Sequence, residues 1–177
     1  MKKTLVEHIS HISPCQEAIS WLESLPASTT PQKAWDACEN GSWMIWLIGK
    51  TIKSEPWSDD RKPFLACALD CALTVKHLWR KISAKKIGDA VAVMRKWIKG
   101  VATKEDVSEA RRDIYADAYT TAATYAVYTA TYAACAADAA SADAACFEAV
   151  FASASRLASQ KQMAAIVRKH YPKPPKL

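Results

Sequence analysis

Turn-forming residues are scarce in this chain, and their scarcity limits the folds that it can adopt. Four of its 177 residues are glycine, none of them after Gly100, and no proline lies between Ala66 and Tyr171. β-Sandwiches and β-barrels need frequent turns rich in glycine and proline. Phosphate-binding loops of the GxGxxG or GxxxxGKS/T type need closely spaced glycines, and neither motif occurs here. The sequence therefore predicts an all-α protein.

Several short motifs mark where the expected helices begin and end. Ser13–Pro14 with Gln16 has the spacing of a capping box, and Thr30–Pro31 gives the same start signal for a second helix. Asn40–Gly41 is expected to end that second helix. Residues 42–49 are apolar on every face, which predicts a short buried helix.

The middle of the chain predicts two longer helices after a proline-containing loop at residues 54–63. Apolar residues keep helical spacing over residues 65–82 and again over residues 84–99, where Gly100 ends the pattern. Ile87, Val91, Met94 and Ile98 are the expected buried side chains of the second of these helices.

A capping-box spacing at Thr103 and Asp106 opens a region without helix breakers that extends to His170. Alanine fills 19 of the 43 positions from 116 to 158. At 1.5 Å per residue, a single helix of this length would be about 100 Å long, whereas a domain of this size is about 40 Å across. We therefore expect the region to fold back, with residues 138–143 as the expected position.

Together these patterns predict a single-domain, multi-helix bundle over residues 1–171, with long Ala-rich C-terminal helices. Residues 172–177 form a Pro/Lys-rich tail that is expected to fray. The first residues lack an apolar stretch, so we expect no secretory signal, and no run of about 18 strongly apolar residues predicts a membrane span. We expect a cytoplasmic protein without membrane contact, in which the six cysteines are reduced and buried.

Positive charge is concentrated between residues 76 and 99, where only Asp89 opposes it. The whole chain carries 24 Lys+Arg and 18 Asp+Glu, a formal net charge of +6. The cations of this cluster are Lys76, Arg80, Lys81, Lys85, Lys86, Arg95, Lys96 and Lys99. Two adjacent helices would present them as one surface that attracts an acidic protein, a nucleic acid or a phosphorylated small ligand. An ordinary solvated helix face is the alternative, and without a DNA-binding motif sequence-specific DNA binding is not expected.

Tryptophans supply the other candidate contacts. Trp57 lies in a polar loop, where it is either an exposed binding anchor or a side chain that fixes the loop to the core. Trp43 and Trp46 lie among apolar residues, which favours core packing over stacking on a ligand.

Residues 21–49 carry a pattern that resembles a known family. The runs WLESLP at residues 21–26 and TPQKAWDACENGSWMIWLIG at residues 30–49 are similar to the opening of an Ala-rich, all-helical family of bacterial immunity proteins. These proteins accompany polymorphic toxins and have relatives in phages. The Ala-rich helices and the run QMAAIVR at residues 162–168 extend the resemblance to about residues 16–170. The resemblance implies a non-enzymatic, protein-binding role and supplies no site residue.

The favoured hypothesis is a non-enzymatic protein that binds and neutralises a toxin or a defence effector through the cation cluster and Trp57. The alternative is a phage counter-defence protein that sequesters a nucleotide-type signalling ligand in a pocket of basic and aromatic residues, for example at a homo-oligomer interface. Cys67 and Cys71 are four residues apart but have no second pair with zinc-site spacing. No nucleophile or acid–base pattern appears, so no catalytic residue, cofactor or metal is expected.

Overall fold

A computed structural model describes residues 4–74, 81–118 and 156–176, and the described residues form eight α-helices and two short 3-10 helices without a β-strand. The all-α prediction is therefore confirmed. The helices are α1 (Leu5–Ile9), α2 (Gln16–Glu23), α3 (Pro31–Ala37), α4 (Gly41–Thr51), α5 (Lys62–Leu73), α6 (Lys81–Ile98), α7 (Lys104–Ala118) and α10 (Arg156–His170). The expected fold-back at residues 138–143 lies outside the described residues.

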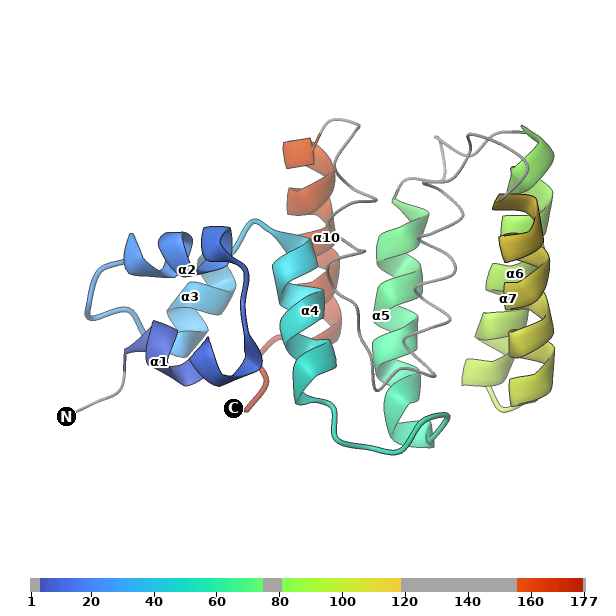
Figure 1. Ribbon diagram of the computed structural model, residues 1–177, viewed down its shortest axis with the longest axis horizontal. Coiled ribbons are helices and arrows are strands. Elements are labelled where there is room, and N and C mark those ends of the chain that lie inside the picture. The colour runs from blue at the N-terminus through green and yellow to red at the C-terminus, as the bar shows by residue number, and fades with distance from the viewer. Residues whose placement is uncertain (1–3, 75–80, 119–155, 177) are drawn as a thin grey trace.

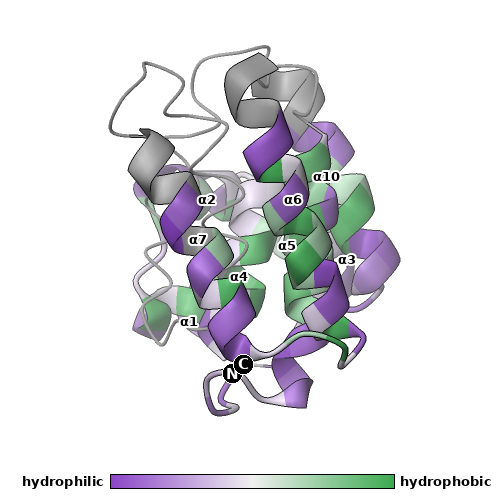
Figure 2. Ribbon diagram, turned by 90° about the vertical axis from the view of Figure 1, so that its right-hand side faces the viewer, coloured by the Kyte–Doolittle hydropathy of each residue, from purple (hydrophilic) through white to green (hydrophobic). Residues whose placement is uncertain are grey.

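The longer helices stand side by side, and the C-terminal helix lies among earlier ones (Figure 1). α10 packs against both α4 and α5, α5 contacts α6, and α6 pairs with α7. The short helices α1, α2 and α3 gather beside α4, at the opposite end of the molecule from α6 and α7. Along most ribbons hydrophobic and hydrophilic stretches alternate (Figure 2), as expected for helices with one buried face.

One hydrophobic core joins α4, α5, α6, α7 and α10. Its largest fully buried side chains are Met44, Leu65, Leu69, Ile87, Met94, Val107, Met163 and Val167. Of the side chains predicted to be buried in α6, Ile87, Val91 and Met94 are buried, and Ile98 packs at the edge of the core. No helix in the described part of the chain is long and apolar enough to span a membrane.

Three short-range signals mark their helices as predicted. The Thr30 side chain accepts a hydrogen bond from Lys33 N at the start of α3. At the start of α7, Thr103 Oγ1 accepts from Asp106 N at 3.1 Å, and Thr103 N donates to Asp106 Oδ2 at 2.7 Å. Gly100 has a φ of 74°, the left-handed conformation that ends a helix such as α6.

Two predicted capping positions are wrong. Cys15, rather than Ser13, precedes α2, and Ser13 adopts a left-handed φ of 57° in the turn before it. Asn40 was expected to end the second helix, but its side chain accepts a hydrogen bond from Trp43 N at 3.1 Å and starts α4. Asparagine suits both ends of a helix, so the residue type alone did not distinguish them.

The predicted helix over residues 65–82 is also wrong in extent. α5 ends at Leu73, and α6 begins at Lys81 rather than at position 84, so Ile82 belongs to α6. Both helices bury one apolar stripe, and no glycine or proline separates them in the sequence. The helical spacing of apolar residues therefore continues across the boundary and conceals it.

Three of the four described cysteines are buried, as predicted, and Cys135 and Cys146 lie outside the described residues. Cys38, Cys67 and Cys71 are buried, Cys15 is half-buried, and none of these four is part of a disulfide. Burial raises the pKa of the Cys38 thiol, and a hydrogen bond to Cys67 together with burial raises the pKa of the Cys71 thiol. The Cys38 and Cys71 thiols therefore stay protonated at neutral pH and serve as small core side chains.

Candidate functional site

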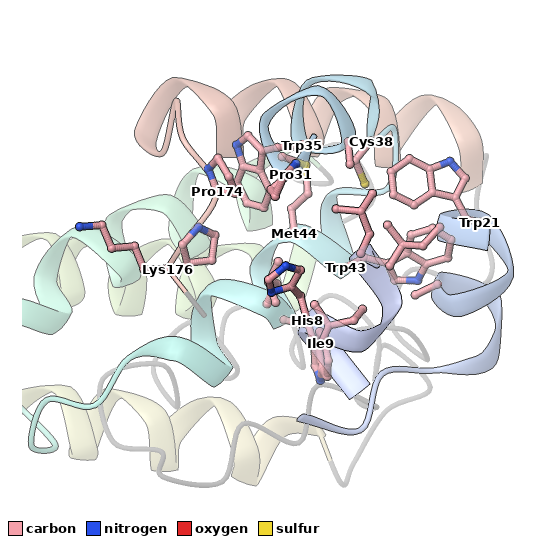
Figure 3. A pocket seen from close by; sticks show the side chains of 17 residues that line it. His8, Ile9, Trp21, Pro31, Trp35, Cys38, Trp43, Met44, Pro174 and Lys176 are labelled. Atoms are coloured by element: carbon pink, nitrogen blue, oxygen red, sulfur yellow. The ribbon is translucent and has the colours of Figure 1, made fainter. Parts of the chain in front are cut away.

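A pocket of about 510 Å³ opens between the short N-terminal helices, α4 and the end of the chain (Figure 3). Its walls are mostly apolar and include four tryptophans, Trp21, Trp35, Trp43 and Trp46. We refer to this cavity as the N-terminal pocket. Its volume and its apolar, aromatic lining are typical of binding sites in proteins.

The pocket exists because α4 carries more apolar surface than the core buries. Ile45 and Ile48 are buried on the core side, whereas Trp43 and Trp46 are only half-buried and line the pocket. The Trp43 ring also lies against Trp21, with ring centroids 6.0 Å apart. The prediction of core packing is therefore incomplete for both α4 tryptophans. The sequence of residues 42–49 already indicated this, because a helix that is apolar on every face must contact other groups on every side.

The segment that carries the family resemblance builds most of this site. Ten of the 17 residues that line the pocket lie within residues 21–49. The other contributions come from α1, from Ala18 of α2, and from the last residues of the chain. The segment that carries the family resemblance thus also supplies most of the walls of this apolar pocket.

Arg168 of α10 forms hydrogen bonds with the backbone of residues at the end of α3 that line the pocket. Its Nη1 atom donates to Cys38 O at 2.7 Å and, more weakly, to Trp35 O at 3.4 Å. These carbonyl groups lie at the C-terminal end of α3, where a cation also interacts favourably with the helix dipole. The arginine therefore fixes α3, with Trp35 and Cys38, in the orientation that forms the wall.

The tail lies along the pocket, contrary to the expectation that it frays. Trp35 Nε1 donates to Tyr171 O at 2.9 Å, and Gln32 Nε2 donates to Pro172 O at 3.0 Å. Pro174 and Pro175 are half-buried and line the pocket. Burial raises the pKa of Tyr171 to about 12, so its hydroxyl stays neutral at physiological pH. The hydrogen bonds to the backbone offset the entropy lost when the tail is ordered.

Ionisable side chains are few at the pocket. His8 and Lys176 belong to its lining. Figure 3 shows the Lys176 ammonium group directed away from the cavity. No other lysine and no arginine is among the lining residues, so phosphate groups find little positive charge there.

The predicted cations that the structure describes do not line the N-terminal pocket. Lys76 and Arg80 lie outside the described residues, and for Lys81 only its place in α6 is described. The other five are exposed and absent from the pocket lining: Lys85, Lys86, Arg95 and Lys96 lie on α6, and Lys99 lies in the turn directly after it. In Figure 1, α6 stands at the opposite end of the molecule from α1, α2 and α3. The described part of the cation cluster is therefore separate from the tryptophan-rich pocket.

Carboxylates accompany several of these cations. Lys85 Nζ lies 2.8 Å from Asp89 Oδ2, and this hydrogen bond raises the pKa of Lys85. Arg95 Nη2 lies 3.3 Å from Asp70 Oδ1 on α5. Both pairs are exposed, and such pairs contribute little to stability. The described part of the cluster is thus a surface of mixed charge.

A groove of about 550 Å³ between α6 and α7 shows the same mixture. Its charged lining consists of one cation and four carboxylates, namely Lys86, Asp89, Asp106, Glu109 and Asp113. Acidic residues of α7, which are distant from the cation cluster in the sequence, thus lie beside Lys86 in space. A partner at this face would meet charges of both signs.

Trp57 packs inward. Its ring lies edge-on against Trp97 with centroids 5.7 Å apart, and Lys62 Nζ is 5.5 Å from the centre of the Trp97 ring. The buried Arg61 ties down the same loop by donating to Ser54 O at 2.6 Å and, through Nε, to Glu55 O at 3.0 Å. Of the two roles considered for Trp57, this geometry favours fixing the loop to the core.

The described residues contain no group of three or more His, Cys, Asp and Glu side chains that would hold a metal ion. Cys67 and Cys71 are fully buried in α5, where Cys71 Sγ lies 3.9 Å from Met163 O. His170 Nε2 lies 2.9 Å from Asp70 Oδ2 and joins α10 to α5. These side chains contact neighbouring helices, and they line neither the N-terminal pocket nor the groove between α6 and α7.

No protein-family model, no curated protein and no solved structure matches this chain. The resemblance to immunity proteins therefore stays a prediction. Two features of the described structure bear on function, namely the N-terminal pocket and the mixed charges of α6 and α7.

Proposed function

We propose that this chain is a non-enzymatic binding protein that neutralises a toxin or a defence effector by forming a stoichiometric complex with it. One observation carries the proposal: the N-terminal pocket already accepts a peptide segment, since residues 171–176 lie along it. Contacts to backbone carbonyl groups and to proline rings are available to a segment of another protein as well. A bound partner would have its working surface covered by the bundle.

The pocket is a suitable anchor site because it contains large aromatic side chains that are not fully buried. Trp46 is half-buried, lines the pocket and is not part of the central core. Tryptophan side chains of this kind contribute most of the free energy of binding at many interfaces. The charged residues of α6 and α7 would orient the approaching partner and raise the association rate, with little effect on the affinity.

The experiment co-expresses this protein with the products of the genes that flank its own, each under separate induction. We expect one product to stop growth, this protein to restore it, and the two to elute together at a fixed ratio in size-exclusion chromatography with light scattering. Trp46→Ala should reduce protection at least about tenfold, which corresponds to the loss of an interface anchor. Lys50→Ala, an exposed change on the same helix, is the matched control.

A second set of variants tests the cation cluster separately. Reversal of Lys85, Lys86, Lys96 and Lys99 to Glu should slow complex formation if α6 contacts the partner. Undiminished protection by this variant would remove α6 from the interface. Protection without a stable complex, or a loss of protection that is equal for Trp46→Ala and Lys50→Ala, would contradict the proposal itself.

Sequestration of a small ligand is the second candidate function, and the four indole rings around the pocket favour it. The lining suits an apolar or aromatic molecule better than a nucleotide, because no lysine or arginine of the lining is directed inward. A thermal-shift series with nucleotides and with aromatic amphiphiles distinguishes the two ligand classes. A ligand present at 100 times its Kd stabilises the folded state by about 2.7 kcal/mol. A rise in melting temperature with nucleotides that is lost in the Trp46→Ala variant would favour sequestration of a nucleotide.

A further inference from the structure

The tail that lines the N-terminal pocket has the sequence of a polyproline segment. Residues 171–176 read YPKPPK, with Pro172 and Pro175 at the spacing of a PxxP motif. Proline fixes φ near −65°, close to the value of the polyproline II helix. Such a segment is ordered before it binds, so binding costs less conformational entropy than for an ordinary chain.

The contacts of the tail follow from this chemistry. A polyproline helix has no internal hydrogen bonds, so its carbonyl groups accept hydrogen bonds from outside. Two consecutive carbonyl groups do so here, from Trp35 Nε1 at 2.9 Å and from Gln32 Nε2 at 3.0 Å. An indole N–H and a carboxamide N–H, both from α3, thus donate hydrogen bonds to the backbone carbonyl groups of two neighbouring tail residues.

The proline rings complete the recognition pattern. Pro172 and Lys173 are exposed, whereas Pro174 and Pro175 are half-buried in the pocket lining. Figure 3 shows Pro174 on the same side of the cavity as Trp35 and Pro31. A groove of aromatic and proline side chains that receives proline rings is the general form of polyproline recognition.

The tail does not fill the cavity. About 510 Å³ stays open with the tail in place, and the paired rings of Trp21 and Trp43 line the other side (Figure 3). A proline-rich segment of another protein would therefore find both the donors of α3 and further aromatic surface. It would first have to displace residues 171–176 from their hydrogen bonds.

We propose that the N-terminal pocket recognises a proline-rich, extended segment of the partner protein, and that the chain's own tail competes for the same site. This inference rests on the proposed function, because it specifies the chemistry of the partner. The tail acts as a tethered competitor. The apparent Kd of a partner therefore equals its intrinsic Kd divided by the fraction of molecules in which the tail has left the site.

The test uses the full chain and a labelled peptide of sequence YPKPPKL, and it measures binding by fluorescence anisotropy. Pro174→Gly with Pro175→Gly weakens the hold of the tail without shortening the protein. We expect this variant to bind the peptide with an apparent Kd about tenfold lower than the wild type, as for a tail that occupies the site about nine-tenths of the time. The peptide YAKAAKL, in which alanine replaces each proline, should bind at least about tenfold more weakly than YPKPPKL.

Gln32 provides a matched pair of variants in the same tail-weakened background. Gln32→Ala removes the donor to the second carbonyl group and should weaken peptide binding several-fold, whereas Lys33→Ala, an exposed change beside it, should not. Circular dichroism checks that both variants fold. Because Gln32 is not part of the central core, a change in stability does not mimic the expected loss.

Three results would overturn the inference. These are no binding of YPKPPKL to either form of the chain, equal binding of YAKAAKL, and equal effects of Gln32→Ala and Lys33→Ala. The outcome is separable from that of the proposed function. Neutralisation of a partner without any peptide binding would support the proposed function and overturn the inference about the tail. Specific peptide binding without a neutralised partner would support the inference about the pocket and contradict the proposed function.

Discussion

Gly41 of α4 lies so close to Met163 of α10 that no side chain fits between the two helices. A Cβ atom built at Gly41 would lie 2.7 Å from Ala164 N and still closer to Met163 Cβ. At the same contact Ser42 N donates to Gln160 Oε1 at 3.0 Å. Glycine therefore sets how closely the helix that carries the pocket tryptophans approaches the C-terminal helix.

Gly41→Ala should destabilise the protein by about 2–3 kcal/mol, because α4 and α10 must move apart to accommodate the methyl group. Urea unfolding measures the change in the free energy of unfolding. Gly88→Ala on α6 is the control, since a Cβ atom there meets nothing within 4 Å. It should stabilise the protein by up to about 1 kcal/mol, the difference in helix propensity between the two residues. Effects of the same sign at both positions would contradict this account.

Arg168→Ala should cost about 1–3 kcal/mol, because the carbonyl group of Cys38 loses its donor in a partly buried place. The loss should also loosen the pocket wall formed by α3 and slow the binding of any pocket ligand. Lys169→Ala, an exposed change at the next position, should be nearly neutral. Chemical denaturation of both variants tests the difference, and equal losses would show that Arg168 does not support α3.

Asp106 should make stability depend on pH. Hydrogen bonds from the backbone N–H and the side chain of Thr103 hold the pKa of Asp106 below its ordinary value of 3.8. A carboxyl group whose pKa is lower in the folded state adds stability above its unfolded pKa and loses it as the pH falls through the folded value. Urea unfolding of wild type and Asp106→Asn between pH 2 and 7 should therefore show a difference that shrinks below about pH 4. A constant difference over this range would be inconsistent with the capping box.

The buried thiols should react slowly with alkylating reagents. Burial raises the pKa of Cys38, and the hydrogen bond to Cys67 and burial raise that of Cys71, so little thiolate forms at neutral pH. Cys15 is half-buried and should be modified before the other cysteines that the structure describes, namely Cys38, Cys67 and Cys71. Peptide mapping by mass spectrometry after brief treatment with iodoacetamide at pH 8 measures the order. In urea the order should disappear, and native Cys71 that reacts as fast as Cys15 would contradict the described core.

Local signals predicted those helix ends that depend on residues close in sequence. Thr103 and Asp106 are three residues apart, and both hydrogen bonds of their capping box are present. The end of α5 was not predictable in the same way, since apolar spacing continues past Leu73 into α6. Asn40 starts α4 instead of ending α3, and the glycine that follows it lies inside the contact with α10, which the local sequence does not reveal.

The candidate site was only partly predictable. The tryptophans of residues 21–49 were recognised as distinctive, but their assignment to the core missed the pocket that Trp43 and Trp46 line. The cation cluster was visible as a run of charge, whereas its proximity to Asp70 depends on how α5 and α6 pack. A count of charges along the chain does not reveal which carboxylates another helix brings alongside.

The sequence by itself determined the helical class of this protein and several helix ends, because propensity and capping act between neighbours in the chain. The tertiary structure alone decided that Gly41 meets Met163, that Arg168 caps α3, and that the tail lies against Trp35. These contacts join residues more than 100 positions apart, such as Gln32 and Pro172. Their selection depends on how several buried faces fit together at once, and the pocket is the space that this fit leaves beside α4.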